Sequence, residues 1–170
     1  MHIGGAEKLI TEIAPLLQAK GHQVEVLLFD GTNTSFKKEL KKADIRILEF
    51  SYGGPVYNPL YIFRLIPLLR KYDIIHTHNT APQLFSALAG ALCSAVLVTT
   101  EHNTSNRRRE WKWYRLIDRW MYNRYRSVIC ISDAAEVNLK KYLGGVHTHI
   151  VTIYNGINIC LLYTSDAADE

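Results

Sequence analysis

The sequence predicts a doubly wound α/β fold, in which a mainly parallel sheet carries helices on both faces. Six short segments rich in Val, Ile and Leu do not alternate cleanly with polar residues, which is typical of strands buried on both faces of a parallel sheet. Segments with helical periodicity lie between most of them, at the spacing of βαβ units. With 48% hydrophobic and 21% charged residues, the 170-residue chain has the composition of a globular domain.

The elements follow one another in the order that this class requires. A first helix presents Leu9, Ile10, Ile13, Leu16 and Leu17 on one face, and Gly21 stands where a helix commonly ends in a left-handed residue. The apolar segments predict strands at 24–29, 45–50, 73–77, 96–100, 127–131 and 150–153. The periodic segments between them predict helices at about 35–42, 59–71, 81–93, 109–125 and 133–143.

The two ends of the sequence depart from the usual pattern. A doubly wound domain usually begins with a strand that lies in the middle of the sheet, whereas this chain opens on a glycine turn and a helix. We therefore expect the first strand to be missing, and the position between strands 24–29 and 73–77 to be vacant or closed by direct pairing of the two. Residues 1–158 are expected to form one incomplete domain, and residues 159–170 a non-native tail.

Charge and cysteine content narrow the class of protein. The net charge of +4 is only mildly basic, and we expect no nucleic acid partner. Cys93, Cys130 and Cys160 lack CxxC spacing, which favours free thiols in a reducing cytosol. The start of the chain has no signal peptide pattern, and its longest apolar run, 84–98, is shorter than the roughly 20 residues that span a bilayer. These features predict a cytoplasmic protein.

A glycine pair opens the first helix. Gly4 and Gly5 would let a ligand approach the backbone closely, and the free N–H groups of a helix N-terminus favour an anion. Neither GxxxxGK[ST] nor GxGxxG is present, so no standard nucleotide loop supports this interpretation. A plain helix start, with Glu7 complementing the helix dipole, is the alternative.

Three histidines lie at the predicted ends of neighbouring strands. His76 and His78 share one face because strand side chains alternate, and His102 follows the next strand. Ligands of open α/β sheets bind outside the carboxyl ends of the strands. The histidines could line a polar substrate cleft, lie buried with satisfied hydrogen bonds, or bind zinc; no fourth ligand or carboxylate motif accompanies them.

The segment 107–126 holds eight of the twenty Lys and Arg residues and all three tryptophans. On a helical wheel the basic side chains form one stripe, bordered by Trp111, that includes Arg108, Lys112, Arg115 and Arg119. The same wheel turns Trp113, Ile117, Trp120 and Met121 towards the core. A basic stripe with aromatic neighbours suits an anionic membrane surface, here the inner face of the plasma membrane, and an ordinary solvated helix face is the alternative.

Several short motifs resemble, together and in order, the N-terminal domain of a glycosyltransferase family 4 enzyme. The motifs, which run from about residue 1 to residue 158, are Gly4-Gly5-Ala6-Glu7, Gly21-His22-Gln23-Val24, Asp73-Ile74-Ile75-His76-Thr77-His78, Thr100-Glu101-His102-Asn103, Cys130-Ile131-Ser132 and Tyr154-Asn155-Gly156-Ile157-Asn158. Enzymes of this family are retaining transferases with the two-domain GT-B fold.

The resemblance implies transfer of a sugar from a nucleotide-sugar donor to a glycan or lipid-linked acceptor, in cell-surface polysaccharide or glycolipid synthesis. It implies no cofactor and no essential metal. The N-terminal domain of the family mainly holds the acceptor, and its site residues carry over to matching positions here. By the resemblance, Gly4 and Gly5 bind the donor, His102 is the active-site histidine, His78, Asn79 and Asn103 line the acceptor side, and Asn155 and Gly156 form the hinge.

This chain also departs from the family pattern. It lacks the strand before Gly4 and the C-terminal domain with its Glu-x7-Glu pair, and Asn158 stands where an acid is usual. We therefore expect an incomplete enzyme that does not turn over by itself. Two other functions remain open: a non-catalytic sugar-nucleotide or lipid-binding module, and a metal-dependent hydrolase that uses His76, His78 and His102.

Overall fold

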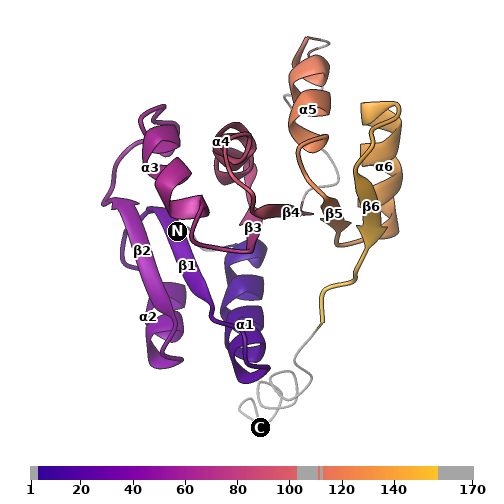
Figure 1. Ribbon diagram of the computed structural model, residues 1–170. Coiled ribbons are helices and arrows are strands. Elements are labelled where there is room, and N and C mark those ends of the chain that lie inside the picture. The colour runs from indigo at the N-terminus through magenta and orange to yellow at the C-terminus, as the bar shows by residue number, and fades with distance from the viewer. Residues whose placement is uncertain (1–3, 103–110, 112, 157–170) are drawn as a thin grey trace, which may run out of the picture.

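The computed structural model describes residues 4–102, 111 and 113–156, and it contains two parallel sheets (Figure 1). The first sheet pairs two strands, and the second has four in the order β3-β4-β5-β6. The strands are β1 (Glu25–Asp30), β2 (Arg46–Ser51), β3 (Ile74–His78), β4 (Val96–Glu101), β5 (Ser127–Cys130) and β6 (His149–Thr152). Every pairing is parallel, so all strands of a sheet end at the same edge.

Helices cover both faces of the sheets. They are α1 (Gly5–Ala19), α2 (Ser35–Lys42), α3 (Tyr61–Leu69), α4 (Thr80–Gly90), α5 (Tyr114–Tyr122) and α6 (Asp133–Leu143). In Figure 1, α1 and α2 lie below the sheets, and α3, α4 and α5 lie above them. The predicted doubly wound α/β class is confirmed, and the elements follow in the predicted order.

Local sequence explains where several helices begin and end. The hydroxyls of Thr34 and Ser132 accept hydrogen bonds from backbone N–H groups in the first turns of α2 and α6. Gly21 follows the end of α1 with φ +92°, and Gly144 ends α6 with φ +61°, both in the left-handed region that favours glycine. The predicted helix at 109–125 lies partly outside the described residues, and its described part, α5, ends at Tyr122.

Three clusters of buried side chains hold the layers together. The largest packs α4, α5 and α6 against the second sheet through residues such as Tyr122, Val128 and Leu139. The second joins α3 and α4 to Phe29 of β1, and the third packs α1 and α2 around Leu40. Helix α4 belongs to two clusters, and it therefore ties the two sheets to one another.

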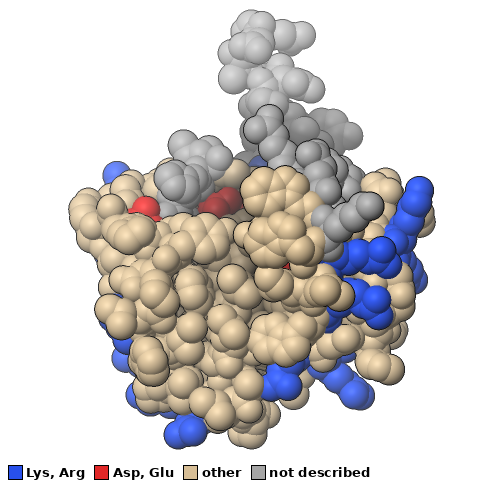
Figure 2. Space-filling model, turned by 90° about the horizontal axis from the view of Figure 1, so that it is seen from above, with Lys and Arg blue, Asp and Glu red and all other residues tan. Residues whose placement is uncertain are grey.

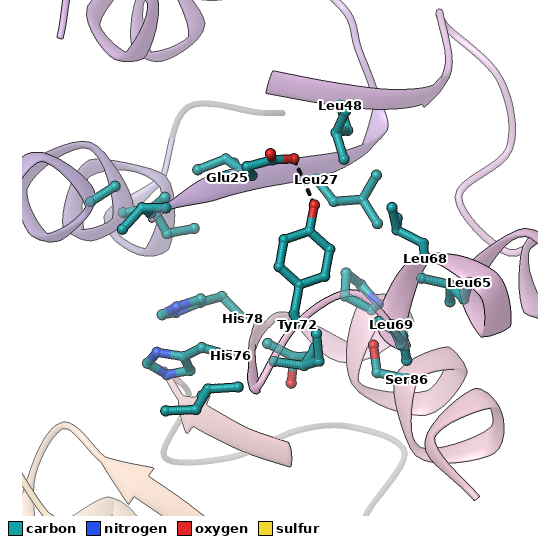
Figure 3. Close-up of a pocket in the computed structure, with 18 of the residues that line it drawn as sticks. Glu25, Leu27, Leu48, Leu65, Leu68, Leu69, Tyr72, His76, His78 and Ser86 are labelled. Carbon is teal, nitrogen blue, oxygen red and sulfur yellow. Dashed lines mark hydrogen bonds between the residues drawn. The ribbon is translucent and has the colours of Figure 1, made fainter. Parts of the chain in front are cut away.

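Among the described residues, no strand lies between β1 and β3. Within the described residues, β1 pairs with β2 alone and β3 with β4 alone, so the two strands do not close on one another. A cavity lies between the sheets and is lined mainly by apolar side chains of α1, β1, α3 and β3 (Figure 3). Of the two arrangements that the sequence predicted for this position, the vacant one is confirmed.

One hydrogen bond crosses this gap. The hydroxyl of Tyr72, just before β3, donates to Glu25 Oε2 of β1 at 2.6 Å (Figure 3). Arg46 of β2 contacts the other oxygen of the same carboxylate at 3.0 Å. Partial burial and the bond to Glu25 raise the pKa of Tyr72 to about 12. Tyr72 therefore links the two sheets at the point where no strand joins them.

We expect Tyr72→Phe to lower the free energy of unfolding by roughly 1.5–3 kcal/mol at neutral pH, because the bond to a charged carboxylate is lost. An unfolded tyrosine ionises near pH 10, whereas folded Tyr72 keeps its proton to about pH 12. Stability should therefore fall as the pH rises from 10 towards 12, and fall less steeply in the variant. Urea unfolding measures both effects, with Tyr57→Phe at an exposed tyrosine as control. If the unfolding free energies of the wild type and Tyr72→Phe fell equally steeply between pH 10 and 12, a stabilising bond between Tyr72 and Glu25 would be contradicted.

Candidate functional site

The histidines of β3 and the end of β4 form one connected group. His78 and Thr100 are register partners at the carboxyl ends of the two strands, and His102 lies just beyond β4. His78 Nδ1 lies 3.0 Å from His102 Nε2, and His76 Nε2 lies 2.8 Å from the hydroxyl of Thr100. The rings of His76 and His78 lie with centroids 4.3 Å apart. Parallel pairing thus brings together side chains 24 residues apart in the sequence.

The N-terminus of α1 meets this group at the same edge. Asn79 Nδ2 donates to Glu7 Oε1 in the first turn of α1 at 3.4 Å. Gly4 is extended and provides no capping side chain, and a Cβ at Gly5 would meet nothing within 4 Å. Asn79 itself has φ +78°, an unfavourable conformation for a residue other than glycine, at the turn from β3 into α4. Of the predicted site residues, His78 is thus bonded to His102, and Asn79 is bonded to Glu7 in the helix turn that follows Gly4 and Gly5.

The three histidines are neutral at pH 7. Burial, with the neighbouring histidines, lowers the pKa of His76 to about 4 and that of His78 to about 3. Burial also lowers the pKa of His102, and the charges of Glu101 and Glu7 oppose that shift. His76 is nonetheless exposed to solvent, and it lines two cavities. Neutral imidazoles donate and accept hydrogen bonds, which is what the hydroxyls of a sugar need.

The lowered pKa values of His76 and His78 predict that the fold loses stability in acid. In the unfolded chain a histidine takes up its proton near pH 6.5, whereas folded His76 and His78 resist protonation down to about pH 4 and 3. Their contribution to stability should be complete above pH 6.5 and should be lost as the pH falls from 6.5 towards the folded pKa values of about 4 and 3. His76→Gln should flatten this dependence in urea unfolding, compared with His22→Gln at an exposed position. If the unfolding free energy of His76→Gln depended on pH as steeply as that of the wild type, this prediction would be contradicted.

The metal hypothesis finds no set of ligands in the described chain. Within residues 4–102, 111 and 113–156, no group of three or more His, Cys, Asp or Glu side chains is placed to hold a metal ion. His78 and His102 instead direct a ring nitrogen at one another.

A second cavity extends from the histidine group to the predicted hinge. It lies between α1 and the second sheet and is lined by Glu12, His76 and Thr100 together with Asn155 and Gly156. Gly156 is the last described residue of the chain. The predicted acceptor-side residue Asn103 and the predicted surface residues Arg108 and Lys112 lie outside the described residues.

The orientation predicted for α5 is wrong. Trp113, Ile117 and Trp120 were expected to face the core, but they are 55%, 39% and 43% exposed, and Leu116 beside them is 71% exposed. Met121 is buried as predicted, but it shares the buried face with Asp118 and Tyr122. Apolar residues occur on both faces of this helix, so their pattern could not select one. Asp118 is buried because the hydroxyl of Tyr142 on α6 donates to its carboxylate at 2.9 Å.

The basic residues of α5 have structural contacts as well as exposed surface. Arg119 is half-buried and donates to the carbonyl oxygen of Gly145 at 3.2 Å, and the guanidinium of Arg115 lies against Gly144. Both arginines thus lie at the C-terminus of α6, where the helix dipole favours cations. Trp111 is 58% exposed at the border of this surface. Seen from above, Lys and Arg side chains gather on the side of the molecule that carries α5 and α6 (Figure 2).

The site also contains a buried acid, Glu101, to which the sequence patterns assigned no role. Glu101, the last residue of β4, is 8% exposed and accepts a hydrogen bond of 2.5 Å from Tyr122 of α5. Its signal in the sequence is a charged residue at the end of an otherwise uncharged strand. Its charge acts on the neighbouring His102, and it therefore belongs to the electrostatic environment of the site.

The described cysteines, Cys93 and Cys130, are free thiols, as predicted, and Cys160 lies outside the described residues. Among the described helices, none has the length and hydropathy that a membrane crossing requires.

Comparisons with known proteins agree with this architecture. Residues 3–160 match Glycosyltransferase Family 4. The fold is similar to that of HepE from Anabaena, solved in complex with UDP-glucose, with a TM-score of 0.75 and 24% identity over 94% of this chain and 43% of that one. It is also similar to a glycosyltransferase from Rickettsia africae, with a TM-score of 0.65 and 25% identity over 98% of this chain and 46% of that one.

A comparison with curated protein sequences found no match. The chain spans less than half the length of the solved structures that it resembles. The family match, in contrast, covers nearly all of the chain, and the fold is the Rossmann-like half of a GT-B architecture. This chain belongs to glycosyltransferase family 4.

Proposed function

We propose that this chain provides the acceptor-side half of a retaining glycosyltransferase, which moves a sugar from a nucleotide-sugar donor to a glycan or lipid-linked acceptor of the cell surface. The observation that carries the proposal is the meeting of the α1 N-terminus with the His78–His102 pair at the carboxyl edge of the sheet. The N-terminus of α1 provides an anion site, and the two histidines provide neutral hydrogen-bonding groups.

The helix N-terminus suits the donor. Backbone N–H groups at the start of α1 favour negative charge, and the open space beside Gly5 leaves room for a diphosphate or for the transferred sugar. Charge that develops on the leaving diphosphate would be stabilised by these aimed dipoles. HepE was solved with UDP and with UDP-glucose, which supports a nucleotide sugar as the class of donor.

The histidines and asparagines suit the sugars. His102 is the residue that we place at the transferred sugar, where a neutral imidazole can orient a hydroxyl. His78, Asn79 and Asn103 are placed on the acceptor side, and Asn155 and Gly156 at the hinge towards a second domain. A sugar-binding module without catalysis would use the same residues, and only turnover separates the two functions.

The experiment begins with the gene. Reading it beyond codon 158 should show a second α/β domain with paired glutamates, and the complete product should release UDP from a UDP-sugar when an acceptor is present. The 170-residue chain alone should release none. A complete product that lacks a second domain, or that binds sugars without turnover, would favour the non-catalytic module.

A second proposal concerns the membrane, and the exposed face of α5 favours it. Trp113, Leu116, Ile117 and Trp120 follow the i, i+3, i+4, i+7 spacing of a helix face and are exposed to solvent. On the helical wheel, Arg115 and Arg119 both lie on one side of this stripe. Aromatic and aliphatic side chains beside cations are the composition of helices that lie in a membrane interface. We propose that α5, with Trp111, attaches a cytoplasmic enzyme peripherally to the inner face of the plasma membrane, where a lipid-linked acceptor would be found.

A further inference from the structure

A hydrogen bond between two histidines lies at the centre of the site, and its direction decides what His102 can offer to a ligand. His78 Nδ1 and His102 Nε2 are 3.0 Å apart. A neutral imidazole has one N–H donor and one lone-pair acceptor, so one of the rings donates and the other accepts. Because the bond uses Nε2 of His102, Nδ1 is the nitrogen of that ring that can meet a ligand.

The charges around the rings select the direction. Burial lowers the pKa of both rings, but the charges of Glu101 and Glu7 oppose that shift at His102, whereas burial together with His76 and His102 lowers the pKa of His78 to about 3. His102 is therefore the more basic of the two, and a proton that the pair takes up goes to His102. A bond from His102 Nε2–H to His78 Nδ1 serves both the neutral and the protonated His102. The opposite direction would place two N–H groups against one another once His102 is protonated.

Two further contacts help to fix the position of the His78 ring. The ring of His76 lies against it with centroids 4.3 Å apart, and His76 Nε2 is itself bonded to the hydroxyl of Thr100 at 2.8 Å. The partners come from β3 and β4, whose pairing fixes the distance between them. The orientation of His78 is therefore set by the sheet and by its neighbouring ring.

We propose that His78 is a positioning residue that holds His102 as the Nε2–H tautomer, so that His102 Nδ1 presents its lone pair to a substrate hydroxyl. The proposal rests on the proposed function, in which His102 meets a sugar, and it refines that function to one atom. A hydroxyl of the transferred sugar or of the acceptor would donate to Nδ1, and Glu7 and Glu101 would stabilise any positive charge that the ring gains.

The test is 15N NMR of the 170-residue chain labelled at histidine, at neutral pH, with His102→Gln to assign the His102 ring. We expect the signal of a protonated nitrogen at Nε2 and of an unprotonated one at Nδ1. His78→Asn keeps an oxygen acceptor near the place of Nδ1 and should preserve this tautomer. His78→Leu removes the acceptor, and the single tautomer should be replaced by signals averaged over both forms.

A proton on Nδ1 of His102 in the wild-type chain, or unchanged signals in His78→Leu, would overturn the proposal. Circular dichroism shows first which variants fold, and if His78→Leu does not, the wild-type signals and His78→Asn decide. The NMR result is independent of turnover. The expected tautomer together with full activity of His102→Ala in the complete enzyme would retain the histidine pair and reject the proposed role of His102 in transfer.

Discussion

Replacing His102 by alanine in the complete enzyme should lower kcat by about 10²-fold or more while the fold is retained. The side chain of His102 is partly buried beyond the end of β4. It is hydrogen-bonded to His78 and belongs to none of the three core clusters. Its loss removes a neutral hydrogen-bonding group from the reacting sugar without opening a core cavity. Release of UDP from the UDP-sugar measures kcat, and the midpoint of thermal unfolding shows whether the fold persists.

His22→Ala is the matched control for this variant. His22 is exposed and precedes β1 of the two-stranded sheet, whereas His102 follows β4 of the four-stranded sheet, so removal of His22 should leave kcat unchanged. A kcat for His102→Ala within a factor of two of wild type would remove His102 from the mechanism, provided that the thermal midpoints agree.

Binding to anionic vesicles should depend on both the apolar and the basic side chains of α5. A fully buried Trp or Leu contributes roughly 1.5–3 kcal/mol, so Trp113→Ala and Leu116→Ala should each weaken vesicle binding about tenfold. Each basic residue near an anionic bilayer contributes about 1 kcal/mol, and Arg115→Gln should weaken binding about fivefold. Co-sedimentation measures the affinity. All three tryptophans lie in 107–126, so a blue shift of tryptophan fluorescence reports on this segment directly.

The control is Leu16→Ala on α1. Leu16 is 64% exposed, comparable to Leu116, but α1 lies on the other side of the sheets from α5 (Figure 1). Its removal should leave vesicle binding unchanged. Added salt should weaken the part of the binding that the arginines provide, because their interaction with the bilayer is screened. Equal binding to neutral and anionic vesicles, or tryptophan fluorescence that does not shift, would leave α5 as an ordinary solvated helix.

The vacant position between β1 and β3 illustrates a prediction made from the order of elements alone. A helix in place of the first strand predicted a gap beside two specified strands, and β1 and β3 indeed remain unpaired with one another. The sequence could not tell whether the gap would close. The structure leaves it open because α3 and α4 pack as one cluster across the two sheets, and Tyr72 bonds to Glu25 across it.

The convergence of the candidate site could also be predicted from the sequence. Parallel strands end at one edge, so residues that follow β3 and β4 must be neighbours there, and Asn79 after β3 bonds to Glu7 in the first turn of α1. The bond between His78 and His102 could not be predicted. It depends on the register of β3 against β4 and on how the rings turn, and neither leaves a pattern along the chain.

The sequence by itself determined the α/β class, the order of helices and strands, and the family to which the chain belongs, because strand and helix periodicities and short motifs are local properties. The tertiary structure alone decided which face of α5 is buried. That helix has apolar residues on both sides. On the buried side, Asp118 accepts a hydrogen bond from the hydroxyl of Tyr142 on α6. A buried carboxylate is tolerated only where a partner satisfies it, and the partner comes from another element. The choice left Trp113, Leu116 and Trp120 in solvent.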